Sequence, residues 1–212
     1  MPLKAAIVPV TPFQQNCTLL WEEASKVGAV VDPGGDLERI EDAIARVGLK
    51  AEKILLTHGH VDHAAGASAL KERLGGVPIE GPHSADKFLL DGLAAQGRAL
   101  GDVSARDVTP DRWLGEGDSV AAAGTTFSVL HCPGHSPGSV VLVNAAQRFA
   151  LVGDVLFRGS IGRTDFPYGD HAALIEAIKT KLIPLGDDFV FICGHGPMSS
   201  IGEERQTNPF LA

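Results

Sequence analysis

The stretch THGHVDH, residues 57–63, decides the fold of this chain. A short apolar run over residues 53–57 leads into it and predicts a strand. An Ala- and Leu-rich run over residues 64–74 follows it and predicts a helix. Loops at strand ends hold side chains firmly and leave a cleft open, so histidines at this junction indicate a functional site.

The spacing within this stretch is typical of metal binding. His58 and His60 are separated by Gly59, which has no side chain. In an extended backbone the two imidazoles project to the same side and can bind one cation. Asp62 and His63 lie at the turn into the helix, where they can face a second cation. Imidazole nitrogens and carboxylate oxygens suit zinc, iron or manganese.

Three further polar residues follow predicted strands in the same way: His135, Asp154 and His195. Four strand ends that each carry imidazole or carboxylate indicate one shared site. The strands that precede these three residues are predicted at 125–131, 149–153 and 189–193.

The rest of the chain reads as short strands and amphipathic helices. Both halves run from strands to a helix, which suggests two similar layers packed face to face. The other predicted strands are 4–10, 17–22, 28–32, 78–81 and 139–143. The other predicted helices are 37–47, 84–95 and 171–182, and residues 97–117 and 155–170 are expected to be irregular.

The composition limits the class of protein. The chain has 212 residues, and we expect a single domain over residues 1–212. Its 18 basic and 26 acidic residues give a net charge of −8, which argues against nucleic acid as a partner. No apolar run reaches the length of a membrane span, so no membrane partner is expected. No feature indicates an oligomeric state.

The cysteines and the N-terminus favour a cytoplasmic location. Cys17, Cys132 and Cys193 are far apart and odd in number, so we expect small buried thiols and no disulfide. The first residues lack the charged head and apolar stretch of a signal peptide. A reducing compartment fits both observations.

Several motifs resemble those of the metallo-β-lactamase superfamily. THGHVDH resembles its H-x-H-x-D-H signature, and HCPGHSPGS, LVGDVLF and ICGHG resemble its later ligand motifs in the same order. The resemblance covers nearly the whole chain. It implies an α/β fold, a four-layer αβ/βα sandwich with the site at one edge of the two sheets.

The resemblance also implies a ligand set for two metal ions. One ion would be held by His58, His60 and His135. The other would be held by Asp62, His63 and His195, with Asp154 as the bridging ligand. Zinc is expected, with iron or manganese as alternatives.

A closer resemblance is to the type II glyoxalases, or hydroxyacylglutathione hydrolases, in their short bacterial branch. It rests on RGSIGRTDFPYGD after Asp154 and on SSIGEERQTNPF near the end of the sequence. It implies hydrolysis of small thioesters such as S-lactoylglutathione to hydroxy acid and glutathione. The nucleophile would be a hydroxide bridging the metals, oriented by Asp62 as the catalytic residue.

The sequence departs from the larger glyoxalases in two places. Their C-terminal helical region, which helps bind glutathione, is not expected here. Thr164 and Asp165 stand where the larger enzymes carry aromatic residues, while Arg163 remains as a candidate substrate contact. These departures predict weak binding of glutathione.

Four polar residues outside the ligand set have ordinary interpretations. We expect His83 to form a turn or cap, His131 to pack at a strand end and His171 to lie exposed at a helix start. For Asp32, orientation of a ligand loop and simple turn formation are both open.

Other functions share this scaffold. A mononuclear iron persulfide dioxygenase and a lactonase are the alternatives. A nuclease is disfavoured by the acidic balance, and a zinc β-lactamase of the common type would place Cys where Asp154 stands. A non-catalytic scaffold protein would be expected to have lost a ligand, and none is lost.

Overall fold

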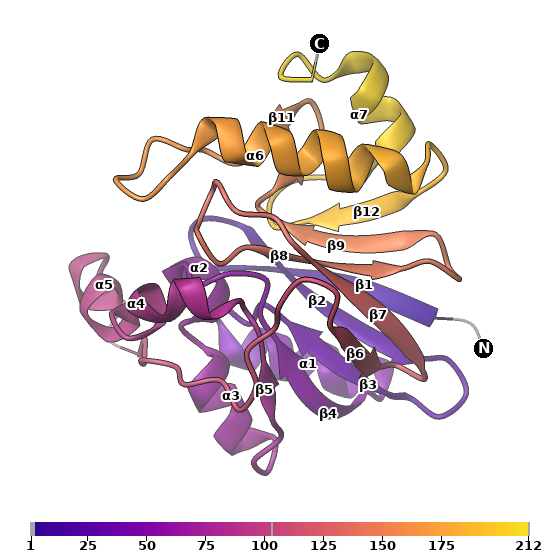
Figure 1. Ribbon diagram of the computed structural model, residues 1–212. Helices are drawn as coiled ribbons and strands as arrows, with labels where there is room; N and C mark the ends of the chain where they lie inside the picture. Colours follow the sequence, from indigo (N-terminus) through magenta and orange to yellow (C-terminus); the bar gives the residue numbers. More distant parts are fainter. Residues whose placement is uncertain (1–2, 103, 212) are drawn as a thin grey trace.

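Two β-sheets face each other in the computed structural model, which describes residues 3–102 and 104–211 (Figure 1). Within these residues the first sheet has five strands in the order β1-β2-β3-β4-β5. The second has six strands in the order β13-β12-β9-β8-β7-β6. Helices cover the outer face of each sheet, so the layers run helix, sheet, sheet, helix, and the predicted αβ/βα sandwich is confirmed.

The first sheet changes from antiparallel to parallel pairing along its width. β1, β2 and β3 pair antiparallel, whereas β3, β4 and β5 pair parallel. Helix α1 (Leu37–Val47) makes the crossover between β3 and β4, and its observed bounds are the predicted ones. The five strands are β1 (Leu3–Val10), β2 (Gln15–Glu22), β3 (Val27–Val31), β4 (Lys50–Leu55) and β5 (Ile79–Glu80).

The second sheet is antiparallel except where β9 and β12 pair parallel. The crossover between these two strands carries a small hairpin, β10 (Leu156–Phe157) with β11 (Ser160–Ile161), and then helix α6 (His171–Ala177). The helix continues as η2 (Ile178–Leu182) and η3 (Ile183–Leu185). The strands are β6 (Ser119–Ala122), β7 (Thr125–His131), β8 (Val140–Asn144), β9 (Phe149–Gly153), β12 (Val190–Cys193) and β13 (Ser199–Ser200).

Alternation along the strands explains why they are apolar throughout. Leu19 of β2 belongs to the core under the outer helices, and the next residue, Leu20, belongs to the core between the sheets. Val141 and Leu142 of β8 divide in the same way between the other outer core and the inner one. Because both faces of these strands are covered, both sets of alternating residues must be apolar.

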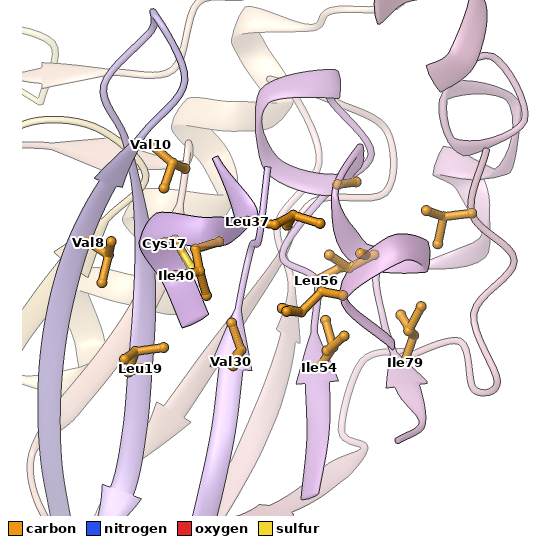
Figure 2. Close-up of a cluster of buried hydrophobic side chains, with 14 of the residues drawn as sticks. Val8, Val10, Cys17, Leu19, Val30, Leu37, Ile40, Ile54, Leu56 and Ile79 are labelled. Atoms are coloured by element: carbon orange, nitrogen blue, oxygen red, sulfur yellow. The ribbon is translucent and has the colours of Figure 1, made fainter. Parts of the chain in front are cut away.

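Helix α1 closes one outer core with an apolar stripe at helical spacing. Leu37 and Ile40 point into a buried cluster with Val30 and Ile54 of the sheet below (Figure 2). Helix α3 (Ala67–Arg73) contributes Leu70 to the same cluster.

The helix predicted over residues 64–74 was wrong in its start, since it is split into α2 (Val61–Ala64) and α3. Between them Gly66 lies against the turn after β3, where an added Cβ would be 2.5 Å from the Pro33 carbonyl oxygen. The helix predicted over 84–95 is also divided. Its parts are η1 (Ser84–Asp86), α4 (Lys87–Leu90) and α5 (Leu93–Ala99).

Several short elements were not predicted from the sequence, among them β13. Strand β6 and the hairpin β10–β11 lie in stretches that were expected to be irregular or were left unassigned. Helix α7 (Ile201–Thr207) was not predicted either. Ser200 caps its start, and the Ser200 hydroxyl accepts a hydrogen bond from the Glu203 amide. No helix among the described residues is long and apolar enough to span a membrane.

Phe127 offers a test of the inner core because its side chain is fully buried between the sheets. Phe127→Ala should lower the free energy of unfolding by about 3–5 kcal/mol through lost burial and a residual cavity. Phe210→Ala, at a residue 45% exposed, should cost under about 1 kcal/mol. Urea unfolding followed by circular dichroism would measure both, and similar losses would contradict this description of the core.

Candidate metal centre

All seven predicted ligands lie together at the edge of the sandwich where β4, β7, β9 and β12 end. They form two groups of three whose ligand atoms lie within 4.8 Å of one another, with Asp154 in contact with both. The first group is His58, His60 and His135, and the second is Asp62, His63 and His195.

The first group brings three imidazole nitrogens to one point. His58 Nε2 lies 3.1 Å from His60 Nδ1, and His135 Nε2 lies 2.9 Å from the same atom. His60 lies just before α2 in extended conformation, which turns its Nδ1 toward the other two rings. Three nitrogens this close suit a shared cation, since each neutral imidazole has only one ring proton.

The second group lies beside the first. His195 Nε2 is 3.2 Å from Asp62 Oδ2 and 3.3 Å from His63 Nε2. A Cβ added at Gly194 would lie 2.0 Å from Asp154 Oδ1, so only glycine fits before His195. The mixed nitrogen and oxygen donors suit a divalent transition metal.

Asp154 lies between the groups in a bridging position. Its Oδ1 is 3.3 Å from His63 Nε2, and its Oδ2 is 3.4 Å from His135 Nε2. Oδ1 is buried and has no hydrogen-bond partner among the described residues. A buried carboxylate oxygen without a donor is costly, and a cation at this position would satisfy it.

Burial favours the neutral, metal-binding form of His58 and His60. Burial, then the neighbouring His135, lowers the pKa of His60 to about 3, and burial also lowers the pKa of His58. Both imidazoles are therefore neutral at physiological pH, as ligands must be.

Against the effect of burial, neighbouring carboxylates raise the pKa of two other imidazoles, Asp154 that of His63 and Asp62 that of His195. Burial alone would raise the pKa of Asp154, but the imidazoles around it, His63 first, bring that pKa below its ordinary value.

Asp32 forms a turn and also contacts a ligand histidine, so both interpretations that the sequence left open apply to it. It has a left-handed backbone conformation at the turn after β3, with φ 50°. Its Oδ2 lies 2.9 Å from His63 Nδ1, and its carboxylate also accepts from the Thr57 amide and hydroxyl. A carboxylate behind a ligand imidazole fixes the ring orientation and the tautomer.

Tyr168 was missed by the sequence reasoning. Its hydroxyl lies 2.9 Å from His60 Nε2, the ring nitrogen that faces away from the first group. Its ring stacks on Phe166 with 5.3 Å between centroids. The aromatic pair in the sequence FPY was the available signal, because two aromatic residues so close together in a glycine-rich loop after a ligand indicate a cavity wall.

A cavity of about 610 Å³ opens over the two groups. Phe13, Phe157, Phe166 and Tyr168 line it, so aromatic walls are present although Thr164 and Asp165 occupy the expected aromatic positions.

Arg163, the candidate substrate contact, lines this cavity, and its side chain already has partners within the protein. Its guanidinium forms two hydrogen bonds with the Asp165 carboxylate and lies over the Phe166 ring. Apart from the ligand histidines, Arg163 is the only basic side chain that lines the cavity among the described residues.

The remaining histidines and cysteines lie outside the two groups. His83 is the cap of η1, and its Nδ1 accepts from the Ala85 amide. His131 stacks on His83 and donates from Nε2 to the Pro137 carbonyl oxygen. His171 is exposed at the start of α6. The three cysteines are buried and free, as predicted.

Metal titration tests the assignment of Asp154. The wild-type chain should bind about two transition-metal ions, because its ligands form two groups that share one carboxylate. Asp154→Ala should weaken binding of both ions by at least about 10–100-fold, because it removes the one carboxylate that the two groups share. His171→Ala, at an exposed histidine outside the groups, should change the binding of neither ion. Saturation of the wild type at one ion, or equal effects of the two variants, would contradict the assignment.

The chain is similar to known proteins over most of its length. The model of the metallo-β-lactamase superfamily matches residues 10–195. Hydroxyacylglutathione hydrolase GloC of Haemophilus influenzae is 46% identical over 206 residues, which are 97% of this chain and 96% of that protein.

Two solved structures are similar over almost their full length. BLEG-1 B3 metallo-β-lactamase has a TM-score of 0.87 and 36% identity, covering 98% of this chain and 99% of that one. TTHA1623 in a di-iron-bound form has a TM-score of 0.85 and 36% identity, covering 97% and 100%. The chain therefore belongs to the metallo-β-lactamase superfamily and is a metallo-hydrolase similar to hydroxyacylglutathione hydrolase.

Proposed function

We propose that this enzyme hydrolyses small thioesters of the S-lactoylglutathione type, giving a hydroxy acid and glutathione. The observation that carries the proposal is the pair of three-ligand groups on either side of Asp154. Residues of both groups line one open cavity. The similarity to GloC along nearly the whole chain supports the choice of substrate.

We propose two divalent metal ions in the two groups, with zinc as the expected metal. Iron is the alternative, supported by the di-iron form of TTHA1623. Bound there, the ions supply positive charge that lowers the pKa of water toward about 7 and stabilises negative charge on the thioester carbonyl oxygen.

Asp62 is the residue we propose to orient the attacking water. It lines the cavity and is partly buried, and its Oδ2 lies 3.2 Å from His195 Nε2. A carboxylate in this place accepts a hydrogen bond from the water and turns its lone pair toward the substrate. Among the described residues Ser160 is the only Ser or Cys that lines the cavity, and its hydroxyl donates a hydrogen bond to the Ile161 carbonyl oxygen and to no base.

The cavity walls support weak binding of glutathione. Glutathione carries two carboxylates, whereas Arg163 is paired with Asp165 and no other Lys or Arg lines the cavity among the described residues. The aromatic walls suit the apolar parts of acyl and thiol groups. We therefore expect other thioesters to be accepted as well.

Steady-state kinetics with two thioesters would test the substrate class. S-lactoylglutathione should be hydrolysed with a high KM, and an uncharged lactoyl thioester should be hydrolysed with similar kcat/KM. A lactone, a β-lactam and oxygen uptake with glutathione persulfide complete the panel. Absence of lactoylglutathione hydrolysis would contradict the proposal, and oxygen uptake would favour the dioxygenase.

The variant Arg163→Ala measures how much this guanidinium contributes to binding of lactoylglutathione. Because it is exposed and paired with Asp165, its removal should raise KM for lactoylglutathione by less than roughly tenfold and leave kcat unchanged. Arg205→Ala is the matched control, since Arg205 forms a similar exposed pair with Asp187 away from the cavity. A hundredfold rise at Arg163 would show that glutathione is held by this residue.

The value of kcat/KM should rise with pH near neutrality and then reach a plateau, because the attacking water must ionise. His60 does not contribute to this rise: its pKa of about 3 leaves it neutral throughout. Activity is thus lost as pH falls through neutrality. A flat kcat/KM between mildly acidic and mildly alkaline buffers would contradict this assignment of the slow step.

A further inference from the structure

Asp86 is a buried acid outside both ligand groups. It ends η1, and its side chain is completely buried. Its Oδ2 accepts hydrogen bonds from the Gly59 amide at 2.8 Å and the Ser136 hydroxyl at 2.7 Å. Its Oδ1 accepts from the Gly138 amide at 2.6 Å. All three donors are neutral, and no described residue places a counter-ion in contact with this carboxylate, so its hydrogen bonds must stabilise the buried charge.

The three donors belong to the two loops that carry the first ligand group. Gly59 lies between His58 and His60, and Ser136 follows His135 directly. These loops come from different sheets, since one follows β4 and the other follows β7. Both oxygens of Asp86 are therefore used to join one loop to the other.

Two glycines allow the loops to approach this closely. A Cβ at Gly138 would lie 2.6 Å from Asp86 Cγ, and a Cβ at Gly59 would lie 2.9 Å from Leu89 Cβ and 3.2 Å from Asp86 Cβ. A backbone hydrogen bond joins the same two segments, because the His83 amide donates to the Gly138 carbonyl oxygen at 3.1 Å. The segment from His83 to Leu89 is thus fitted to both ligand loops.

We propose that Asp86 is a positioning residue of the first metal site, which clamps the loop of His58 and His60 to the loop of His135. The inference rests on the proposed metal pair. The second group depends on other partners, since Asp32 backs His63, and His195 Nδ1 lies 3.1 Å from the Phe13 carbonyl oxygen. Loss of the clamp should therefore loosen one metal ion and spare the other.

Titration of the metal-free variants with zinc alone tests this selectivity. Asp86→Asn keeps the shape but replaces one acceptor oxygen with an NH₂ group, so at least one donor loses its partner. One of the two zinc-binding steps should weaken by about 10–100-fold, while the other stays within about threefold of wild type.

Glu204→Gln is the matched control. Glu204 is also completely buried and accepts from three neutral donors: the Gly159 amide, the Ser199 hydroxyl and the Asn208 side chain. No predicted metal ligand contacts it through a hydrogen bond. It should lower the Tm of the metal-free protein as Asp86→Asn does, yet bind both zinc ions normally. Equal loss of zinc affinity in the two variants would reduce Asp86 to a merely structural residue and overturn the proposal.

Double variants identify the ion that is lost. Asp86→Asn should cause little further loss of zinc affinity in a His58→Ala background, because that variant already disables the first site. In a His195→Ala background it should cause its full loss of zinc affinity. The opposite pattern would overturn the proposal. If Asp86→Asn does not fold, Ser136→Ala removes a single donor and should still weaken one step several-fold; normal binding of both ions by that variant would contradict the clamp.

These titrations contain no substrate, so they are independent of the proposed reaction. A chain that binds two zinc ions but leaves lactoylglutathione intact would contradict the proposed function and leave the clamp standing.

Discussion

The contact between the two sheets determines the geometry of the metal centre, because each ligand group takes side chains from both sheets. His58 and His60 follow β4 of the first sheet, whereas His135 follows β7 of the second. The other group is divided in the same way, with His63 from the first sheet and His195 from the second. The buried residues between the sheets therefore set the separation of the ligand loops.

Hydrogen bonds between the two sheets, at the edge that carries the ligands, further fix the positions of the ligand loops. The Val140 amide donates to the Thr57 carbonyl oxygen at 2.8 Å, and so joins β8 to the loop after β4. The Asn16 side chain donates to the carbonyl oxygens of Cys193 and Gly196 and so holds the loop of His195. A site made from loops on rigid strands, with such supports behind the ligands, keeps the preorganisation that catalysis needs.

The layer order was predicted from the resemblance to a known superfamily, and the shared site was predicted from strand ends that carry imidazole or carboxylate. The α1 bounds followed from the spacing of Leu37 and Ile40, and the motifs indicated which strand ends carry metal-binding side chains. The supports were not predictable, since Asp86 and Tyr168 act on residues far away in the chain. Their types are common in helix starts and loops, and only tertiary packing distinguishes them from surface residues. The division of the helix at Gly66 depends likewise on the distant Pro33 carbonyl.

The division of each ligand group between the sheets has a consequence for the order of folding and metal uptake. The first group spans residues 58–135 and the second spans residues 62–195, so each group forms only when distant parts of the chain have come together. Long-range pairing, including the parallel pairing of β9 with β12, must be complete before three donors can surround one ion. A metal ion bound here joins the two sheets, and by mass action it stabilises their docked state over any form in which they have separated. The cofactor of such an enzyme thus also acts as a cross-link, and metal starvation should expose the chain to proteolysis as well as stop its turnover.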